Sequence, residues 1–179
     1  MNKKVYLVVG KARNGKDTVA QIAMQELQKR GVSCTHLAFA SLLKKQAEAV
    51  GWDGKKDKKG RTLLQHLGDV AKEYHGNDYY AGSTLGEVLV DNEHNVFFIT
   101  DCRFKEELNL FKTCGLISTV MVRVIRPGFK SDLSEEQQNH KSEIDLDDVK
   151  EDYLILNDSD ENVLRRKVIE FLDSEETEE

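Results

Sequence analysis

The feature that most constrains this chain is the segment Gly-Lys-Ala-Arg-Asn-Gly-Lys at residues 10–16, which fits the pattern G-x-x-x-x-G-K. It directly follows an apolar, β-branched run from Val5 to Val9 and precedes a segment with helical periodicity. In such a loop, backbone N–H groups encircle a polyphosphate and the helix N-terminus adds positive potential. A plain glycine turn with a solvated lysine is the alternative. The order strand, loop, helix favours a phosphate loop and predicts nucleotide binding, with Lys16 reaching the β- and γ-phosphates.

The residue after the lysine is normally Ser or Thr, whose hydroxyl meets Mg²⁺, but here it is Asp17, followed by Thr18. A carboxylate is also a hard oxygen ligand. We therefore expect Asp17 to hold the metal directly or through water, and Thr18 to contact the α-phosphate.

Strand and helix patterns alternate along the chain, which predicts a three-layer α/β domain with a mostly parallel sheet flanked by helices. We expect one domain over 1–179, because its length fits one domain and not two independent ones. Strands are predicted at 5–9, 32–39, 95–100, 117–125 and 153–156. Helices are predicted at 18–30, 41–50 (capped by Ser41), 62–74, 79–90 and 104–114, with a last helix opened by an Asp158–Glu161 capping box.

Three segments lack this periodicity. The glycine- and lysine-rich residues 51–61 are predicted to form an exposed loop. Residues 126–150 are polar and aperiodic, and we expect a lid-like functional loop there. The acidic end, 173–179, is expected to fray into solvent. The stretch of about 41–91 is expected to be a helical, substrate-binding region.

Composition excludes several classes of protein. Lys and Arg number 26 against 32 Asp and Glu, a net charge of −6, which argues against broad nucleic-acid or anionic-membrane binding. No apolar run approaches the roughly 20 residues that span a bilayer. The three cysteines lack the spacing of a disulfide framework or a zinc site. The first residues do not read as a signal peptide, so we expect a soluble cytoplasmic protein.

A second cluster of candidate residues follows the strand at 95–100. Asp101 at the end of this strand is typical of an acid that orders Mg²⁺, and Arg103 suits a second anionic substrate. The alternative is structural, with Asp101 capping the next helix and Arg103 pairing with Glu107. Arg61 suits a monophosphate, and a solvated cation at a helix start is equally compatible with its surroundings.

The lid-like segment carries the remaining candidates. Arg126 begins it and is expected to act as a cation over the transferring group. His140 lies in His-Lys-Ser-Glu with no second histidine nearby, so hydrogen bonding or capping is expected rather than metal binding. The other four histidines, including His36, are scattered and receive no role.

Several motifs occur together in the order of a known family: GKARNGKDT, RTLLQHLG at 61–68, ITDCRFKEE at 99–107, HKSE at 140–143, and YLILND before the last helix. Together they resemble the deoxynucleoside monophosphate kinases of bacteriophages and their bacterial relatives, over the range from Val5 to Phe171. Asp17 is shared with that family. Lys105, where the family often has proline, and Lys141 inside HKSE are departures.

This resemblance implies a P-loop NTP hydrolase or nucleoside monophosphate kinase-like fold. It also implies transfer of the ATP γ-phosphoryl group to a deoxynucleoside monophosphate, with Mg²⁺, in a possible homodimer in the cytoplasm (the host cytoplasm, if phage-encoded). The resemblance assigns ATP and Mg²⁺ to Gly10, Lys11, Arg13, Asn14, Gly15, Lys16, Asp17 and Thr18, with Asp17 and Asp101 as metal ligands. It assigns the acceptor to Arg61, Gln65, Asp101, Arg103 and Glu107, with Arg126, His140 and Glu143 closing over the site, and catalysis to Lys16, Asp101, Arg103 and Arg126.

Two alternatives remain open from the sequence. Phosphomevalonate kinases of the animal type also carry a GKD loop, and dephospho-coenzyme A kinases share the fold, so a kinase of another phosphorylated small molecule is the first alternative. A nucleotide-binding regulatory module without catalysis is the second alternative.

Overall fold

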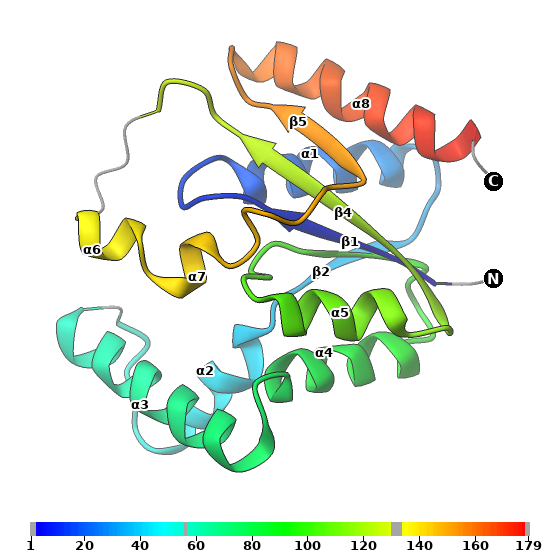
Figure 1. The fold of residues 1–179 in the computed structure, drawn as a ribbon. Coiled ribbons are helices and arrows are strands. Elements are labelled where there is room, and N and C mark those ends of the chain that lie inside the picture. The colour runs from blue at the N-terminus through cyan, green and yellow to red at the C-terminus, as the bar shows by residue number, and fades with distance from the viewer. Residues whose placement is uncertain (1–2, 56, 130–133, 178–179) are drawn as a thin grey trace.

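The computed structural model describes residues 3–55, 57–129 and 134–177. Within these residues the core is a five-stranded sheet in the order β2-β3-β1-β4-β5, and every pairing is parallel. The strands are β1 Lys3–Val9, β2 Cys34–Leu37, β3 Val96–Ile99, β4 Ile117–Ile125 and β5 Tyr153–Leu156. The predicted α/β fold with a mostly parallel sheet is confirmed (Figure 1).

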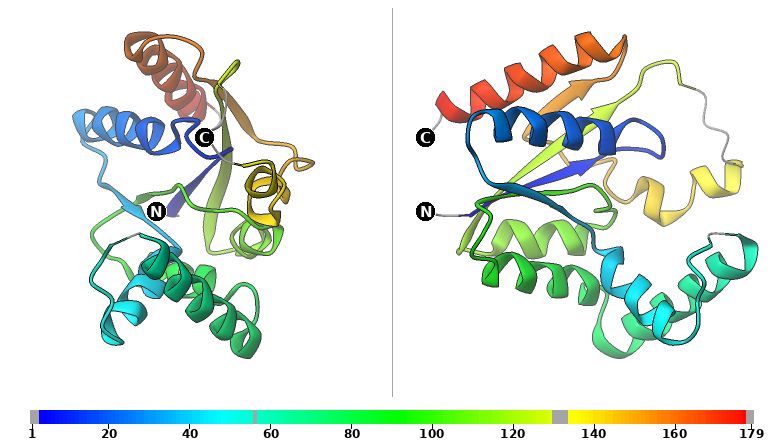
Figure 2. Two further views of the ribbon diagram at one scale, coloured as in Figure 1. Left: turned by 90° about the vertical axis from the view of Figure 1, so that its left-hand side faces the viewer. Right: turned by 180° about the vertical axis from the view of Figure 1, so that it is seen from behind.

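Helices cover both faces of the sheet, which gives the three predicted layers (Figure 2). α1 packs beside α8 on one face, and α4 packs beside α5 on the other. α2 and α3 extend from the α4 side as a helical projection (Figure 1). The helices are α1 Lys16–Lys29, α2 Ala40–Ala49, α3 Lys58–His75, α4 Tyr79–Val90, α5 Lys105–Thr113, α6 Glu135–Gln138, α7 Lys141–Ile144 and α8 Glu161–Thr177.

The central strand β1 shows why the sequence run at 5–9 is continuously apolar. Tyr6 and Val8 join the core beneath α1 and α8, whereas Val5, Leu7 and Val9 join the core on the α4 and α5 side. Both faces of a parallel sheet are buried, so no polar residue alternates with the apolar ones. Packed side chains on both faces of the sheet therefore support its carboxyl edge.

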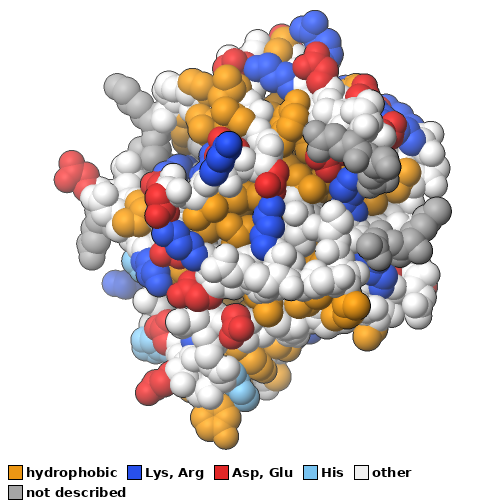
Figure 3. All heavy atoms as spheres, turned by 45° about the vertical axis from the view of Figure 1, so that its right-hand side comes forward, with side chains coloured by type: hydrophobic (Ala, Val, Ile, Leu, Met, Phe, Trp, Pro, Cys, Tyr) orange, Lys and Arg blue, Asp and Glu red, His pale blue; other side chains and the backbone are white. Residues whose placement is uncertain are grey.

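The predicted loop at 51–61 is wrong at its C-terminal end. α3 begins at Lys58, because the Asp57 carboxylate accepts a hydrogen bond from the Gly60 N–H at 2.8 Å and caps the helix. The apolar residues that recur at helical spacing along α3 form a stripe on one face of the helix. This stripe is less buried than its spacing predicts, since the side chains of Val70 and Tyr74 are 65% and 84% exposed. Hydrophobic side chains are visible at the lower end of the molecule, where α2 and α3 lie (Figures 1 and 3).

Two other segments are more ordered than the sequence predicts. The lid-like region contains α6 and α7, although residues 130–133 lie outside the described residues. The acidic end continues α8 to Thr177 instead of fraying at Asp173; residues 178–179 are not described. Arg30 explains this extension, since its guanidinium pairs with Asp173 at 2.7 Å and with Glu176 at 2.8 Å.

Two predicted helix caps are wrong. α2 begins at Ala40, so Ser41 lies inside it, and the cap comes instead from the distant Asp101. The last helix is capped by Asp160 and not by Asp158, because Asp160 accepts from the N–H groups of Asn162 and Val163. Among the described residues, no helix has the length and apolar character needed to cross a bilayer.

Candidate active site

The segment between β1 and α1 adopts backbone angles that depend on glycine. Gly10 and Gly15 have φ of 142° and 97°, a region that side chains disfavour. A Cβ on Gly10 would lie 2.3 Å from the Val124 carbonyl oxygen, and one on Gly15 would lie 2.5 Å from the Asn157 Nδ2. Arg13 also has a positive φ, of 62°. The two glycines of the motif are thus required by close packing as well as by conformation.

Two asparagines fasten this loop to the carboxyl edge of the sheet. Asn14, which is buried, donates from Nδ2 to the Val124 carbonyl oxygen at 3.1 Å. Asn157 follows β5 and donates from its own Nδ2 to the Asn14 carbonyl oxygen at 3.0 Å. The chain's own side chains therefore hold the loop against β4 and β5, which is the preorganisation that anion binding by backbone N–H groups requires.

Lys16 opens α1 and lies over the loop. Its Nζ donates to the carbonyl oxygens of Gly10 at 2.8 Å and Lys11 at 3.0 Å. Burial lowers the pKa of Lys16, and the charge of Arg103 lowers it further, while Glu143, Asp17 and Asp101 oppose the shift. Four charged groups from three separate segments thus act on this one ammonium.

The Asp17 carboxylate is held by a hydrogen bond from another element. Thr100, which follows β3, donates its hydroxyl hydrogen to Asp17 Oδ1 at 2.6 Å. The Thr100 oxygen lies 3.1 Å from Nε2 of His36 on β2. His36 received no role from the sequence, and it now lies next to the side chain that holds Asp17.

The structural alternative was that Asp101 caps the next helix and that Arg103 pairs with Glu107, and both parts of it are wrong. Asp101 caps α2 instead of the next helix, because its two carboxylate oxygens accept from the N–H groups of Phe39 at 2.9 Å and Ala40 at 3.0 Å. The Arg103 guanidinium pairs with Glu143 on α7 rather than with Glu107.

Glu107 is buried within the first turn of α5, with 5% of its surface exposed. Its Oε2 accepts from the N–H groups of Arg103 at 2.9 Å and Phe104 at 3.1 Å. Burial raises the pKa of Glu107 above its ordinary value. The contacts of Glu107 therefore orient the backbone around Arg103.

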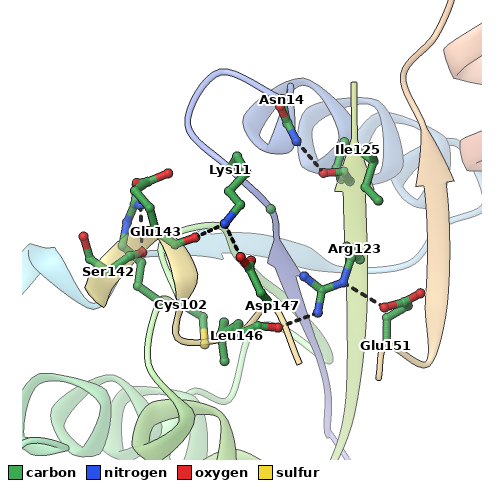
Figure 4. A pocket seen from close by; sticks show the side chains of 13 residues that line it. Lys11, Asn14, Cys102, Arg123, Ile125, Ser142, Glu143, Leu146, Asp147 and Glu151 are labelled. Carbon is green, nitrogen blue, oxygen red and sulfur yellow. Dashed lines mark hydrogen bonds and ion pairs between the residues drawn. The ribbon is translucent and has the colours of Figure 1, made fainter. Parts of the chain in front are cut away.

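The short helix α7 is fastened to the phosphate loop (Figure 4). Glu143 Oε2 accepts from the Ala12 N–H at 3.0 Å, while Oε1 pairs with Arg103. Lys11 of the loop adds two further hydrogen bonds, since its Nζ donates to the Glu143 carbonyl oxygen and to the Asp147 carboxylate. One carboxylate thereby joins a loop N–H group and an arginine, the two kinds of donor that also bind phosphate.

Three cavities contain the predicted site residues considered next. A cavity of about 380 Å³ lies beside α1 and α8, lined by Arg13, Gly15, Lys16, Asp17, Thr18, Arg126 and Asn157 among others. A second, of about 310 Å³, lies between α2, α3 and α5, lined by Phe39, Leu64, Gln65, Lys72, Asp101, Arg103 and Glu107 among others. A third, of about 470 Å³, lies between the loop, β4 and α7, with Gly10, Lys11, Asn14, Arg103 and Glu143 on its walls (Figure 4).

The predicted residues line more than one cavity. Arg103 borders both the second and the third, and in the third it lies with Gly10, Lys11 and Asn14, which are predicted for ATP. Arg61 is exposed in the first turn of α3 and does not line the second cavity with Gln65. Arg126 lines the first cavity, and its guanidinium carbon lies 5.0 Å from the centre of the Phe129 ring.

His140 acts as the expected helix cap, since its Nδ1 accepts from the Ser142 N–H at 3.3 Å at the start of α7. The site contains further residues that the sequence patterns do not indicate, among them Thr100, His36, Asn157, Lys72 and Tyr80. Thr100 ends one predicted strand and Asn157 directly follows another, so strand-end position was the signal that could have identified them.

The donors beside Lys16 suit Mg²⁺. Asp17 Oδ2 has no hydrogen bond among the described residues, while Asp101 is oriented by two N–H groups. No three His, Cys, Asp or Glu side chains gather as a metal cluster in the described part of the chain. Mg²⁺ commonly takes one or two carboxylates and completes its shell with water and phosphate oxygens, so Asp17 and Asp101 fit as its protein ligands.

Comparison with known proteins supports the fold. No protein-family model matches the chain, and no curated protein matches it by sequence. Among solved structures, the chain is similar to dephospho-CoA kinase from Campylobacter jejuni, with 15% identity, a TM-score of 0.57 and coverage of 97% of this chain and 98% of that one. It is also similar to the Mycobacterium tuberculosis APS kinase CysC in complex with AMPPNP and APS, with 17% identity, a TM-score of 0.52 and coverage of 96% and 98%.

At these identities the likeness concerns the fold alone. The chain has the α/β fold of P-loop kinases, with a parallel sheet in the order 2-3-1-4-5.

Proposed function

We propose that this protein is an ATP-dependent kinase that transfers the γ-phosphoryl group to a phosphorylated small molecule. The observation that carries the proposal is the anchored loop at 10–16, with Lys16 on the wall of one cavity and its ammonium acted on by the charges of Asp101 and Arg103, which line another. A phosphoryl donor and an acceptor must meet at one point from opposite directions, and a cation at that point stabilises the charge of the transferring group.

The residues of the first cavity are the proposed donor site. In this proposal, N–H groups of the loop and the α1 N-terminus bind the β- and γ-phosphates, and Lys16 neutralises the transferring group. Arg126 lies at the edge of this cavity as a further cation. Mg²⁺, when bound by Asp17 and Asp101, would screen the charge on the phosphate oxygens.

The second cavity is the proposed acceptor site. It combines apolar surfaces of Phe39, Leu43 and Leu64 with polar groups including Gln65, Lys72 and Arg103. Apolar walls with a few polar groups suit a base, and the arginine suits a monophosphate. Together with the sequence resemblance, this composition supports a deoxynucleoside monophosphate as the acceptor, giving a deoxynucleoside diphosphate and ADP. Arg61, Glu107, His140 and Glu143 remain proposed as acceptor or lid residues, and a homodimer remains a prediction.

A different phosphorylated acceptor is the second candidate. The observation that favours it is the fold likeness to a dephospho-CoA kinase over nearly the whole of both chains. A regulatory module without catalysis is the remaining alternative.

The test is ADP release from Mg-ATP, followed optically with a panel of acceptors. The panel holds each deoxy- and ribonucleoside monophosphate, dephospho-CoA, APS and phosphomevalonate. We expect release that depends on one or more deoxynucleoside monophosphates. Release with dephospho-CoA, APS or phosphomevalonate alone would replace the acceptor, and ATP binding without release for any acceptor would favour the regulatory module.

Two variants on α1 test the role of the loop lysine. Lys16→Met should lower turnover by about a thousandfold or more, since it removes the cation from the transferring group. Lys29→Met is the control, because its side chain is 67% exposed at the far end of the same helix. Equal turnover in the two variants would contradict the proposed mechanism.

A further inference from the structure

The site contains a chain of three side chains from three separate elements. Asp17 lies in the first turn of α1, Thr100 follows β3, and His36 lies on β2. Their polar atoms are joined by distances of 2.6 Å from Thr100 Oγ1 to Asp17 Oδ1 and 3.1 Å from His36 Nε2 to Thr100 Oγ1. β2 and β3 are adjacent and parallel, which places His36 beside the strand that leads to Thr100.

The direction of the hydrogen bonds follows from the chemistry of the groups. An ionised carboxylate only accepts, so the Thr100 hydroxyl must donate its single hydrogen to Asp17. Having donated its one hydrogen, the Thr100 hydroxyl oxygen can only accept a further hydrogen bond. His36 Nε2 must therefore carry the hydrogen that lies between the two atoms. An imidazole with hydrogen on Nε2 thus fixes the direction in which the threonine donates.

We propose that Thr100, supported by His36, is a positioning residue that fixes the Asp17 carboxylate for Mg²⁺. The inference rests on the proposed function, because it concerns how the nucleotide's metal is held. Thr100 is 6% exposed and has little freedom to rotate away, whereas Asp17 is an exposed side chain that would otherwise sample several rotamers. With Oδ1 held by the threonine, Oδ2 is the oxygen left for a cation.

This arrangement accounts for the unusual residue after the loop lysine. A serine or threonine there brings one short hydroxyl to the metal, whereas an aspartate is longer and has a freely rotating carboxylate. A hydrogen bond from a neighbouring strand removes that freedom. Partners that orient metal ligands typically change metal affinity by about 10- to 100-fold when they are removed.

The experiment measures nucleotide affinity by titration calorimetry as a function of Mg²⁺ concentration, so that binding and not turnover is the readout. Thr100→Val keeps the shape of the side chain and removes the hydroxyl, and Thr100→Ser keeps the hydroxyl. We expect the Mg²⁺ concentration at half-maximal tight ATP binding to rise about tenfold in Thr100→Val and to stay within about twofold of the wild type in Thr100→Ser. ATP affinity in the absence of Mg²⁺ should be the same in all three proteins.

A double-mutant cycle separates positioning from a general effect on folding. If Thr100 acts through Asp17, Thr100→Val should change the Mg²⁺ midpoint in the wild type and leave it unchanged in an Asp17→Asn background. The His36 ring also gives a spectroscopic readout, since long-range ¹H–¹⁵N spectra report which ring nitrogen carries hydrogen. We expect the Nε2–H form in the wild type and in Thr100→Ser, and a shift of the Nε2 resonance in Thr100→Val, which lacks the hydroxyl oxygen that accepts from Nε2–H.

The outcomes distinguish this inference from the proposed function. An unchanged Mg²⁺ midpoint in Thr100→Val, or an equal rise in the Asp17→Asn background, overturns the positioning role while ATP binding stands. Wild-type ATP binding that does not depend on Mg²⁺ also overturns it and leaves a nucleotide-binding protein. A wild type that binds no ATP overturns both the inference and the proposed function.

Discussion

At the scale of single residues, several side chains of the site form hydrogen bonds with backbone groups of the chain itself. Asn14 and Asn157 hold the phosphate loop, and Glu107 and Asp101 accept hydrogen bonds from backbone N–H groups. Such contacts fix where the loop's own N–H groups and the Arg103 guanidinium can lie. We expect such residues to act on ligand affinity through the backbone groups that they hold.

Asn157 gives a test of this indirect role. Asn157→Ala removes the hydrogen bond to the Asn14 carbonyl oxygen, which is worth about 1 kcal/mol, so the affinity for ATP should fall about fivefold in titration calorimetry. Asn162→Ala, on the exposed side of the first turn of α8, is the control and should bind ATP as the wild type does. Identical affinities in the two variants would show that the loop does not need this anchor.

The buried Glu107 gives a prediction about pH. Burial raises its pKa, so the folded protein binds this proton more tightly than the unfolded chain, and the free energy of unfolding falls as pH rises through the raised pKa. Glu107→Gln removes this dependence. The stability of the variant relative to the wild type should therefore be more favourable at pH 7.5 than at pH 4.5, as measured by urea unfolding.

The neighbouring Glu106 is the matched control for that experiment. It is exposed on the same turn of α5, and Glu106→Gln removes an exposed carboxylate in place of the buried one. A parallel pH dependence in the two variants would mean that burial of Glu107 is not its cause.

At the scale of elements, the segment predicted as a lid is tied to the loop that it would cover. α7 is only Lys141–Ile144, too short to be stable by itself. It is held by the Glu143 contacts with Ala12 and Arg103 and by the bonds from Lys11. These contacts use groups that the proposed function assigns to phosphates, so substrate binding and α7 docking are expected to influence each other.

Glu143→Gln tests how firmly α7 is docked. The variant keeps the size of the side chain but loses the charge that pairs with Arg103, and charge-assisted hydrogen bonds contribute about 1.5–3 kcal/mol. Amide hydrogen exchange over 141–147 should be at least about tenfold faster than in the wild type. Asp148→Asn, which removes only an exposed pair with Lys105, should leave that exchange unchanged; faster exchange in both would place the cause elsewhere.

At the scale of the whole molecule, stability comes from the two apolar layers and not from the stripe on α3. Phe97 on β3 is fully buried in the core on the α4 and α5 side of the sheet. Val70 lies on the helix with the most regular apolar spacing and is nevertheless 65% exposed. Helical periodicity shows that a helix has an apolar face, but it does not show how much of that face its own chain covers.

Two substitutions test whether stability comes from the buried core and not from the stripe on α3. Phe97→Ala should lower the free energy of unfolding by about 3–5 kcal/mol, because it leaves a large cavity in a packed core. Val70→Ala should change it by no more than about 0.5 kcal/mol. Urea unfolding of both variants gives the comparison, and a cost above about 2 kcal/mol for Val70→Ala would indicate that α3 is covered in solution.

The sequence by itself determined the class of fold, the phosphate loop and the order of most elements. These features are encoded locally: continuous apolar runs for buried strands, helical spacing for α1 and α5, and glycines where positive φ is required. Its errors also had local causes. Ser41 and Asp158 are reasonable caps by residue type, and 173–177 is acidic enough to be read as solvated.

Only the tertiary structure decided which side chains meet. Asp101 caps a helix that begins 61 residues earlier, Thr100 bonds to an aspartate 83 residues away, and Glu143 reaches both Ala12 and Arg103. No period or spacing encodes such pairs, because they arise when a parallel sheet brings the ends of distant strands to one edge. The sequence therefore identified most candidate residues of the site, and the sheet determined which of them act together.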